Sequence, residues 1–271
     1  MAKIYSAGVD AGSTYTKAAI IDESGRLVAT SILMTGIRIN EAAKKAFSEV
    51  LKKAGISEEE VSILVGTGYG RYNITFGNMQ VTEISCHARG AHYLFPKTRT
   101  VLDMGGQDTK AIRINDRGEV VDFCMNDKCA AGTGRFIEGA AKALGLTLSE
   151  VGELSLKGRK PVKISSTCAV FAETETMEQL AWGNSIEDVL YGVHTSMAIR
   201  SIGLLRRVGI EPELTFTGGV SQNIGMVKCL KEQLNMEINT SSLTVYCGAI
   251  GAALFGLEKV KASQLVSVGG W

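Results

Sequence analysis

An apolar strand that ends in an aspartate, a glycine-bearing tight turn and a second strand occur twice in this chain. The first copy reads DAGSTYTK (Asp10–Lys17) and the second reads DMGGQDTK (Asp103–Lys110). The Asp, the first Gly, the Thr and the Lys keep the same offsets, and each copy continues into a polar turn and a third strand. This repeat predicts two similar halves, built around three-strand units at 1–35 and 100–123.

Two such hairpins can hold a nucleoside triphosphate from both sides. The turn glycines Gly12, Gly105 and Gly106 allow backbone N–H groups to approach phosphate oxygens closely, because no side chain stands in the way. Asp10 and Asp103 supply oxygen ligands that can hold a hydrated Mg2+ between them. The alternative is that the repeat is only a scaffold in which acidic residues cap turns.

Other phosphate-binding patterns fit the chain less well. No Gly-x-x-x-x-Gly-Lys-Ser/Thr run is present in the sequence, which excludes a P-loop. The segment GTGYG at 66–70 follows an apolar strand, but Arg71 stands where a dinucleotide-binding loop has its third glycine. We therefore expect a plain glycine-rich loop at this position.

The composition narrows the class of partner and the compartment. With 29 basic and 28 acidic residues in 271, the formal net charge is +1, so nucleic acid and membrane surfaces are not indicated as partners. No apolar stretch reaches transmembrane length and Met1 leads into a strand rather than a signal peptide, which predicts a cytoplasmic protein. In that compartment the six cysteines are not expected to form disulfides.

Strands and helices alternate along the chain, which indicates an α/β architecture. Hydrophobic periodicity, glycines and prolines predict the element bounds. Helices are expected at 40–54, 83–95, 134–144, 169–182, 186–208, 224–234 and 248–259, and further strands at 61–65, 213–217 and 243–247.

The diglycine Gly218-Gly219 is a third glycine site that suits a nucleotide. It lies at the end of a predicted strand, where bare backbone lets a flat adenosine group approach, and the following helix N-terminus adds a favourable dipole. Gly-Gly is also common in ordinary turns, so the motif gains weight only beside the two phosphate hairpins.

The cysteines fall into two groups. No Cys-x-x-Cys pair is present, which excludes ferredoxin-type spacing and the usual zinc knuckles. Cys229 and Cys247 lie in apolar segments and Cys86 lies at a predicted helix start beside His87, and all three are expected to be buried packing residues. Cys129 and Cys168 each precede a predicted helix and have small neighbours.

A helix N-terminus favours the thiolate form that ligates metals, so Cys129 and Cys168 are candidate iron–sulfur ligands. Two thiolates do not complete a [4Fe–4S] cluster, but a two-fold symmetric dimer would supply four. Burial in the core is the alternative for both residues. Cys124 is another possible ligand, although it falls in a strand-like run.

The phosphate hairpins, Gly218-Gly219 and the final small-residue helix resemble the actin/hexokinase/Hsp70 ATPase superfamily. Together with the cysteine turns, the chain resembles the BadF/BadG/BcrA/BcrD-type ATPase family and, within it, the activators of (R)-2-hydroxyacyl-CoA dehydratases. The resemblance runs over essentially the whole chain. It rests most specifically on VDAGSTYTK, DMGGQDTK, NDKCAAGTGRF, ISSTCAVFAETE and FTGGVSQN.

The resemblance implies a fold of two duplicated ribonuclease-H-like domains around a nucleotide cleft, with residues 1–96 and 248–271 in one half and 97–247 in the other. It further implies a homodimeric ATPase of anaerobic amino-acid fermentation that holds one [4Fe–4S] cluster per homodimer, ligated by Cys129 and Cys168. Such a protein takes one electron from ferredoxin or flavodoxin. It uses Mg2+ and ATP, which it converts to ADP, to deliver that electron to the dehydratase component.

The same resemblance assigns roles in the ATP site. Asp10 and Asp103 would position hydrated Mg2+, and Gln107 or Asp108 could orient the attacking water. Lys17 would contact phosphate, or it could be a solvated strand residue. The cofactor-binding set expected from the motifs is Gly12, Ser13, Thr14, Tyr15, Thr16, Lys17, Gly105, Gly106, Gly132, Thr133, Gly134, Gly218, Gly219 and Gln222.

Two other functions are compatible with the same fold. A small-molecule kinase would have a sugar pocket with an acidic base and would be colourless. A non-catalytic actin-like scaffold would polymerise and would contain no iron.

Overall fold

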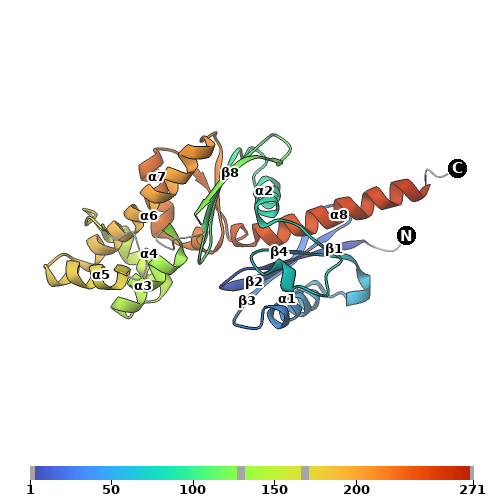
Figure 1. Ribbon diagram of the computed structural model, residues 1–271, viewed down its shortest axis with the longest axis horizontal. Coiled ribbons are helices and arrows are strands. Elements are labelled where there is room, and N and C mark those ends of the chain that lie inside the picture. Colours follow the sequence, from blue (N-terminus) through green and yellow to red (C-terminus); the bar gives the residue numbers. More distant parts are fainter. Residues whose placement is uncertain (1–3, 127–131, 166–170, 269–271) are drawn as a thin grey trace. The chain divides into compact units, whose positions relative to one another are not determined.

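The computed structural model describes residues 4–126, 132–165 and 171–268. The chain divides into two compact units. The first unit comprises residues 1–96 and 246–271, and the second unit comprises residues 97–245. Each unit is built on a five-stranded sheet (Figure 1). In the ranges that the structure describes, no helix is both long enough and apolar enough to cross a membrane.

The sheet of the first unit has the order β3-β2-β1-β4-β5. Strands β1, β2 and β3 form an antiparallel meander, and β4 and β5 add in parallel on the other side of β1. The strands are β1 (Tyr5–Ala11), β2 (Tyr15–Asp22), β3 (Leu27–Met34), β4 (Val61–Thr67) and β5 (Met79–Gln80), and the helices are α1 (Ile39–Ala54), α2 (Glu83–Leu94) and α8 (Cys247–Val268).

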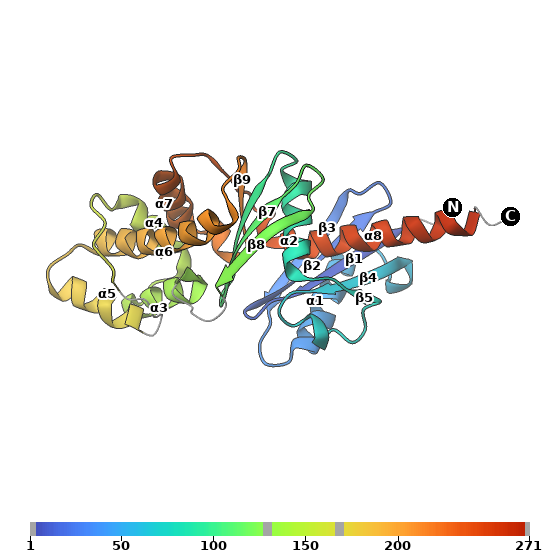
Figure 2. The same ribbon diagram turned by 45° about the horizontal axis from the view of Figure 1, so that its top comes forward.

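Helices cover both faces of this sheet. Successive side chains of a strand point to opposite faces, so each strand contributes residues to both layers. On β2, Ala18 and Ile20 pack with α1, whereas Ala19 and Ile21 pack with α8. Figures 1 and 2 show α1 and α8 on opposite sides of the strands. A helix of small residues suits the second face, since α8 passes so close to Gly8 that a Cβ there would collide with its backbone.

Helices α2 and α8 also touch backbone to backbone. A side chain at Gly90 would collide with the carbonyl of Cys247, and one at Gly251 would collide with the carbonyl of Cys86. Both cysteines are fully buried at this contact, as is Cys229 in the second unit. Burial raises the pKa of the Cys86 thiol to about 12. The prediction that these three cysteines are packing residues is therefore confirmed.

The sheet of the second unit has the order β10-β9-β6-β7-β8, which repeats the first with the same pattern of antiparallel and parallel pairs. Its helices gather on one side of the strands (Figures 1 and 2). The strands are β6 (Thr100–Met104), β7 (Thr109–Ile114), β8 (Val120–Asn126), β9 (Leu214–Thr217) and β10 (Ile238–Asn239), and the helices are α3 (Gly134–Leu144), α4 (Leu148–Lys157), α5 (Ala172–Ala181), α6 (Ile186–Val208) and α7 (Ile224–Leu234).

The predicted strand at 243–247 is wrong. Residues Thr244–Tyr246 form a 3-10 turn and Cys247 begins α8. Ser241 causes the difference, because its carbonyl accepts hydrogen bonds from the backbone and the hydroxyl of Thr244, at 3.2 and 2.7 Å. Such local bonds compete with strand pairing. Helix α4 and the two-residue strand β10 are additions that the sequence patterns did not predict.

Candidate functional site

Asp10 is the penultimate residue of β1 and is buried, with 2% of its surface exposed. Its cross-strand partner is Lys17, whose Nζ lies 3.6 Å from Oδ2 of Asp10. Among the described residues, none donates a hydrogen bond to Oδ1 of Asp10. A buried carboxylate oxygen without a donor is costly unless a cation or water meets it. Asp10 therefore has the chemistry to meet a hydrated Mg2+.

Three further segments of the first unit converge on Asp10. Gly68 has a φ of 90°, and a side chain there would collide with Oδ1 of Asp10. A Cβ at Gly248 would stand 2.8 Å from Oδ2 of Asp10 and 2.9 Å from Nε2 of His87. The loop at 66–70 thus packs on the carboxylate, which the expectation of a plain glycine-rich loop did not anticipate.

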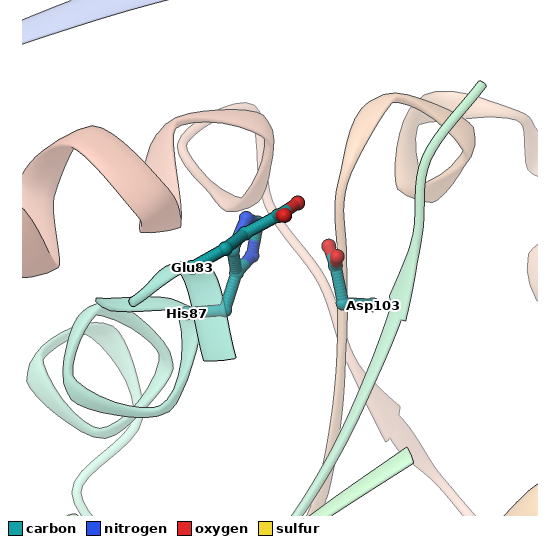
Figure 3. A group of neighbouring side chains, drawn as sticks. All are labelled: Glu83, His87 and Asp103. Atoms are coloured by element: carbon teal, nitrogen blue, oxygen red, sulfur yellow. The ribbon is translucent and has the colours of Figure 1, made fainter. Parts of the chain in front are cut away.

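His87 and Glu83 come from the start of α2, which Thr82 caps by accepting a hydrogen bond from the backbone of Ser85. Figure 3 shows the two side chains projecting from the same face of this helix, one turn apart. His87 is buried and Glu83 is partly exposed. The helix therefore presents an imidazole to the neighbourhood of Asp10 and Gly248, a feature that sequence reasoning missed.

Hydrogen bonds within the first unit hold the turn of the first hairpin. The backbone N–H of Gly12 donates to the carbonyl of Tyr15 at 3.2 Å, and the Thr35 hydroxyl donates to the carbonyl of Gly12 at 2.8 Å. Thr16 is fully buried, with its hydroxyl 2.9 Å from that of Thr35. Ser13 and Thr14 are partly exposed at the turn, and Tyr15 is exposed.

Asp103 occupies the equivalent place in the second unit, at the end of β6, where its carboxylate stands off the strand (Figure 3). The Thr217 hydroxyl donates to Oδ1 at 3.0 Å, and Nζ of Lys110 lies 3.4 Å from Oδ2. The same Nζ is 2.8 Å from Oδ1 of Asp108. Two carboxylates and one ammonium thus form a cluster in this hairpin, in which Asp103 and Lys110 are buried and Asp108 is partly exposed.

The start of α3 holds the turn that contains Gln107 and Asp108. The backbone N–H groups of Gly134 and Arg135 donate to the carbonyls of Gly105 and Gly106, at 2.8 and 3.1 Å. The Thr109 hydroxyl donates to the carbonyl of Gly132 at 2.6 Å. Thr133, which lies between Gly132 and Gly134 in the sequence, is buried. The structure therefore brings the predicted residues of both segments together.

Gly218 and Gly219 have different roles. Gly218 has a φ of 82°, and a side chain there would meet Oδ1 of Asp103 at 2.7 Å, so the fold itself requires this glycine. At Gly219 a Cβ would meet no atom of the described chain within 4 Å. The amide nitrogen of Gln222 is engaged within the second unit, where it donates to the carbonyl of Ser241 at 2.9 Å.

Cys129 and Cys168 lie outside the described residues, but the helix that follows each of them is described. Residue 132 leads directly into α3, and residue 171 leads into α5. Cys124 lies on β8, where an N–H of the Arg207 guanidinium approaches its sulfur at 3.8 Å.

The main residues that sequence reasoning missed are Lys110, Thr217, His87 and Gly248. The sequence contained a pattern that indicates Lys110 as a site residue, because the repeat keeps Asp and Lys at one offset in both copies. The other three come from remote segments and only the tertiary fold brings them to the aspartates.

The chain matches known proteins over nearly its whole length. The family model described as the BadF/BadG/BcrA/BcrD ATPase family matches residues 7–256. The chain belongs to this family. The (R)-2-hydroxyglutaryl-CoA dehydratase activating ATPase of Acidaminococcus fermentans is 44% identical over 257 residues, which cover 94% of this chain and 98% of that protein.

Solved structures agree with this membership of the BadF/BadG/BcrA/BcrD ATPase family. The activator of the 2-hydroxyisocaproyl-CoA dehydratase from Clostridium difficile, solved with bound ADPNP, matches with a TM-score of 0.90 and 39% identity. That match covers 96% of this chain and 97% of the other. A ROK family glucokinase from Streptomyces griseus has a TM-score of 0.60 at 14% identity, covering 94% and 99% of the two chains. It supports the fold alone, which is the actin/hexokinase-like ATPase fold predicted.

Proposed function

We propose that this chain is an ATP-dependent one-electron reductase that activates a (R)-2-hydroxyacyl-CoA dehydratase. The observation that carries the proposal is the 44% identity over 94% of the chain to a protein named as the activating ATPase of such a dehydratase. Both relatives described above are named as activators but for different acyl groups, so the proposal stops at the class of 2-hydroxyacyl-CoA. The two hairpins with their paired Asp and Lys residues give that proposal a chemical basis.

We assign ATP to the two hairpins, with residues 1–96 and 248–271 as one half of the ATPase and 97–247 as the other. Ser13 and Thr14 would offer backbone N–H groups to phosphate, and Lys17 its ammonium, which lies beside the Gly12 turn. Asp10 would hold hydrated Mg2+, since its buried Oδ1 accepts no hydrogen bond from the described residues. Bound Mg2+ would neutralise charge on the phosphate oxygens.

The second hairpin would complete the site. Asp103 would add negative charge for the metal, and Gly219 would lie beside the adenosine, because the space at its α-carbon is open. Gln107 is favoured over Asp108 for orienting the attacking water, since Lys110 already holds the Asp108 carboxylate at 2.8 Å. A neutral amide can both donate to and accept from a water molecule.

We assign the [4Fe–4S] cluster to Cys129 and Cys168, shared by two copies of the chain. The residues around them suit thiolates, because each precedes a helix whose N-terminal end favours negative charge. The cluster would supply the one-electron step between ferredoxin or flavodoxin and the dehydratase component. Among the other four cysteines, three are fully buried, which leaves Cys124 as the alternative ligand.

Hydrogen bonds join the second hairpin to the residues that follow the proposed cluster segment. The turn from Gly105 to Asp108 is bonded to Gly132, Gly134 and Arg135, and these residues directly follow the segment that contains Cys129. A change in the turn on ATP hydrolysis would therefore displace the start of α3. Such motion can change the environment of a cluster and hence its potential.

Anaerobic purification followed by a visible spectrum and an iron assay tests this function. We expect a brown protein with about four irons per dimer, ATPase activity, and ATP-dependent activation of a 2-hydroxyacyl-CoA dehydratase by a low-potential donor. A colourless protein that phosphorylates a sugar would contradict the proposal. A colourless ATPase that forms filaments would contradict it as well.

A further inference from the structure

Lys110 is an unusual residue for the interior of a protein. It lies on β7 with only 1% of its surface exposed. Its Nζ is 2.8 Å from Oδ1 of Asp108 and 3.4 Å from Oδ2 of Asp103. An ammonium group is buried at high cost unless carboxylates compensate its charge. The two aspartates and the lysine therefore depend on one another electrostatically.

Lys17 has the same place in the repeat but different surroundings. Both lysines are cross-strand partners of the hairpin aspartate, Asp10 or Asp103. The side chain of Lys17 is 12% exposed, and its Nζ lies 3.6 Å from Oδ2 of Asp10, beyond hydrogen-bond distance. A Cβ at Gly12 would stand 3.4 Å from the same Nζ, so the ammonium lies at the hairpin turn.

The two aspartates differ in the same way. Both oxygens of Asp103 have partners, because Thr217 donates to Oδ1 and Lys110 approaches Oδ2. Oδ1 of Asp10 is buried and accepts no hydrogen bond from the part of the chain that the structure describes. One hairpin therefore has a fixed carboxylate, and the other has a carboxylate with an open acceptor.

We propose that Lys110 is a positioning residue, an internal counter-ion that fixes Asp103 and Asp108 so that the second hairpin is rigid before nucleotide arrives. Lys17 is then the lysine that binds phosphate, and Asp10 is the aspartate that meets the metal most directly. This assignment rests on the proposed ATP site. It gives different roles to two hairpins that are alike in sequence. A preorganised charge cluster requires little rearrangement when the ligand binds.

A matched pair of variants, Lys110→Met and Lys17→Met, tests the proposal, since methionine keeps most of the aliphatic stem in each case. The first readout is thermal unfolding of the nucleotide-free protein. We expect Lys110→Met to lower the Tm by about 10 °C, because the buried Asp103 and the partly exposed Asp108 lose their shared cation. Lys17→Met should lower the Tm clearly less than Lys110→Met, because the Lys17 ammonium is partly exposed and lies 3.6 Å from one carboxylate, whereas Lys110 compensates two.

The second readout is the Kd of a fluorescent ADP analogue, measured with EDTA and again with Mg2+. Lys17→Met should raise the Kd about tenfold or more under both conditions, through loss of a charge-assisted contact. Lys110→Met should raise the Kd less than Lys17→Met does under both conditions, because Lys110 does not touch phosphate and affects the nucleotide only through the order of the second hairpin. An unchanged Tm together with a tenfold weaker Kd in Lys110→Met would overturn the proposal, since Lys110 would then be a phosphate ligand.

The double variant Asp108→Asn/Lys110→Met keeps the test decisive if the single variant does not fold. Removal of one carboxylate should restore part of the lost Tm, since the defect is uncompensated charge. A double variant no more stable than Lys110→Met alone would contradict the counter-ion role. If the unmutated protein binds no ADP, the proposed ATP site fails, whereas the Tm series still measures the Lys110 cluster.

Discussion

Glu175 binds Ser165 twice through one carboxylate oxygen. Oε1 of Glu175 accepts the backbone N–H of Ser165 at 2.6 Å and its hydroxyl at 2.7 Å. Glu175 lies in α5 and is buried, while Ser165 is the residue directly before the segment that contains Cys168. The carboxylate therefore anchors the entry to this segment on the helix that follows it.

We predict that Glu175→Ala lowers the iron content of anaerobically purified protein and speeds iron loss in air. Hydrogen bonds to a buried carboxylate are worth about 1.5–3 kcal/mol, so the free energy of unfolding should also fall by about 2–3 kcal/mol. Glu173→Ala is the control on the same helix, because Glu173 forms an exposed pair with Lys142 at 3.3 Å. Equal iron retention in both variants would contradict the anchoring role.

Asp10→Asn and Asp103→Asn should each reduce ATP hydrolysis by about a hundredfold or more, through loss of a charge near the metal. The fold should be retained, since asparagine has the same shape and Lys110 keeps Asp108 as a partner when Asp103 is replaced. Steady-state phosphate release and circular dichroism are the measurements. Near-normal turnover in both variants would refute the assignment of the metal site.

Gly219→Val should weaken ADP binding about tenfold or more without lowering stability, because the valine would occupy open space assigned to adenosine. Gly218→Ala should behave differently. Its φ of 82° disfavours any side chain, and the Cβ would meet Oδ1 of Asp103, so we expect a lower Tm. Nucleotide titration and thermal unfolding of both variants separate the two effects. Unchanged ADP affinity in Gly219→Val would exclude adenosine from this site.

Cys129→Ala or Cys168→Ala should each remove iron from the whole dimer, because each substitution deletes two of four ligands through symmetry. Cys229→Ala is the matched control and should keep full iron, since its thiol is buried and burial raises its pKa to about 11. Iron and protein assays on anaerobic samples give the ratio. Four irons per monomer, or full iron in Cys168→Ala, would rule out the shared cluster.

His194 should make stability depend on pH. Burial lowers the pKa of this fully buried imidazole to about 4, so the unfolded chain, with a pKa near 6.5, binds the proton more readily. This stabilisation is fully present above pH 6.5 and is lost as the pH falls toward 4, at about 1.4 kcal/mol per pH unit. Urea unfolding at pH 7.5, 6.0 and 5.0 should show a slope that is smaller in His194→Gln. An equal slope in both proteins would count against this origin.

Elements with local stop signals were predictable from the sequence. Helix α6 spans the predicted residues because Ser185 caps its start and Gly209 follows its end. Gly145, with a φ of 66°, ends α3 in the same way. The duplicated hairpins were equally clear, since every strand pair is local and antiparallel.

Long-range contacts were not predictable from one sequence. The alternation of side chains along β2 and β7 does not distinguish the more exposed Lys17 from the buried Lys110. The difference in burial comes from the residues that pack on each hairpin. The convergence of Gly68, His87 and Gly248 on Asp10 likewise joins segments that are far apart in the chain. The sequence identified the carboxylate but not its neighbours.

Helix α8 follows the second unit in the chain, yet it covers one face of the first sheet, where Ile250 and Leu257 pack with Ala19 and Ile21. During synthesis, residues 1–96 leave the ribosome long before this cover exists. The second unit is contiguous and can fold first, whereas the first must wait with an apolar face exposed. Such a nascent chain is a natural client for a chaperone, and truncation within α8 should cause aggregation rather than a milder loss of activity.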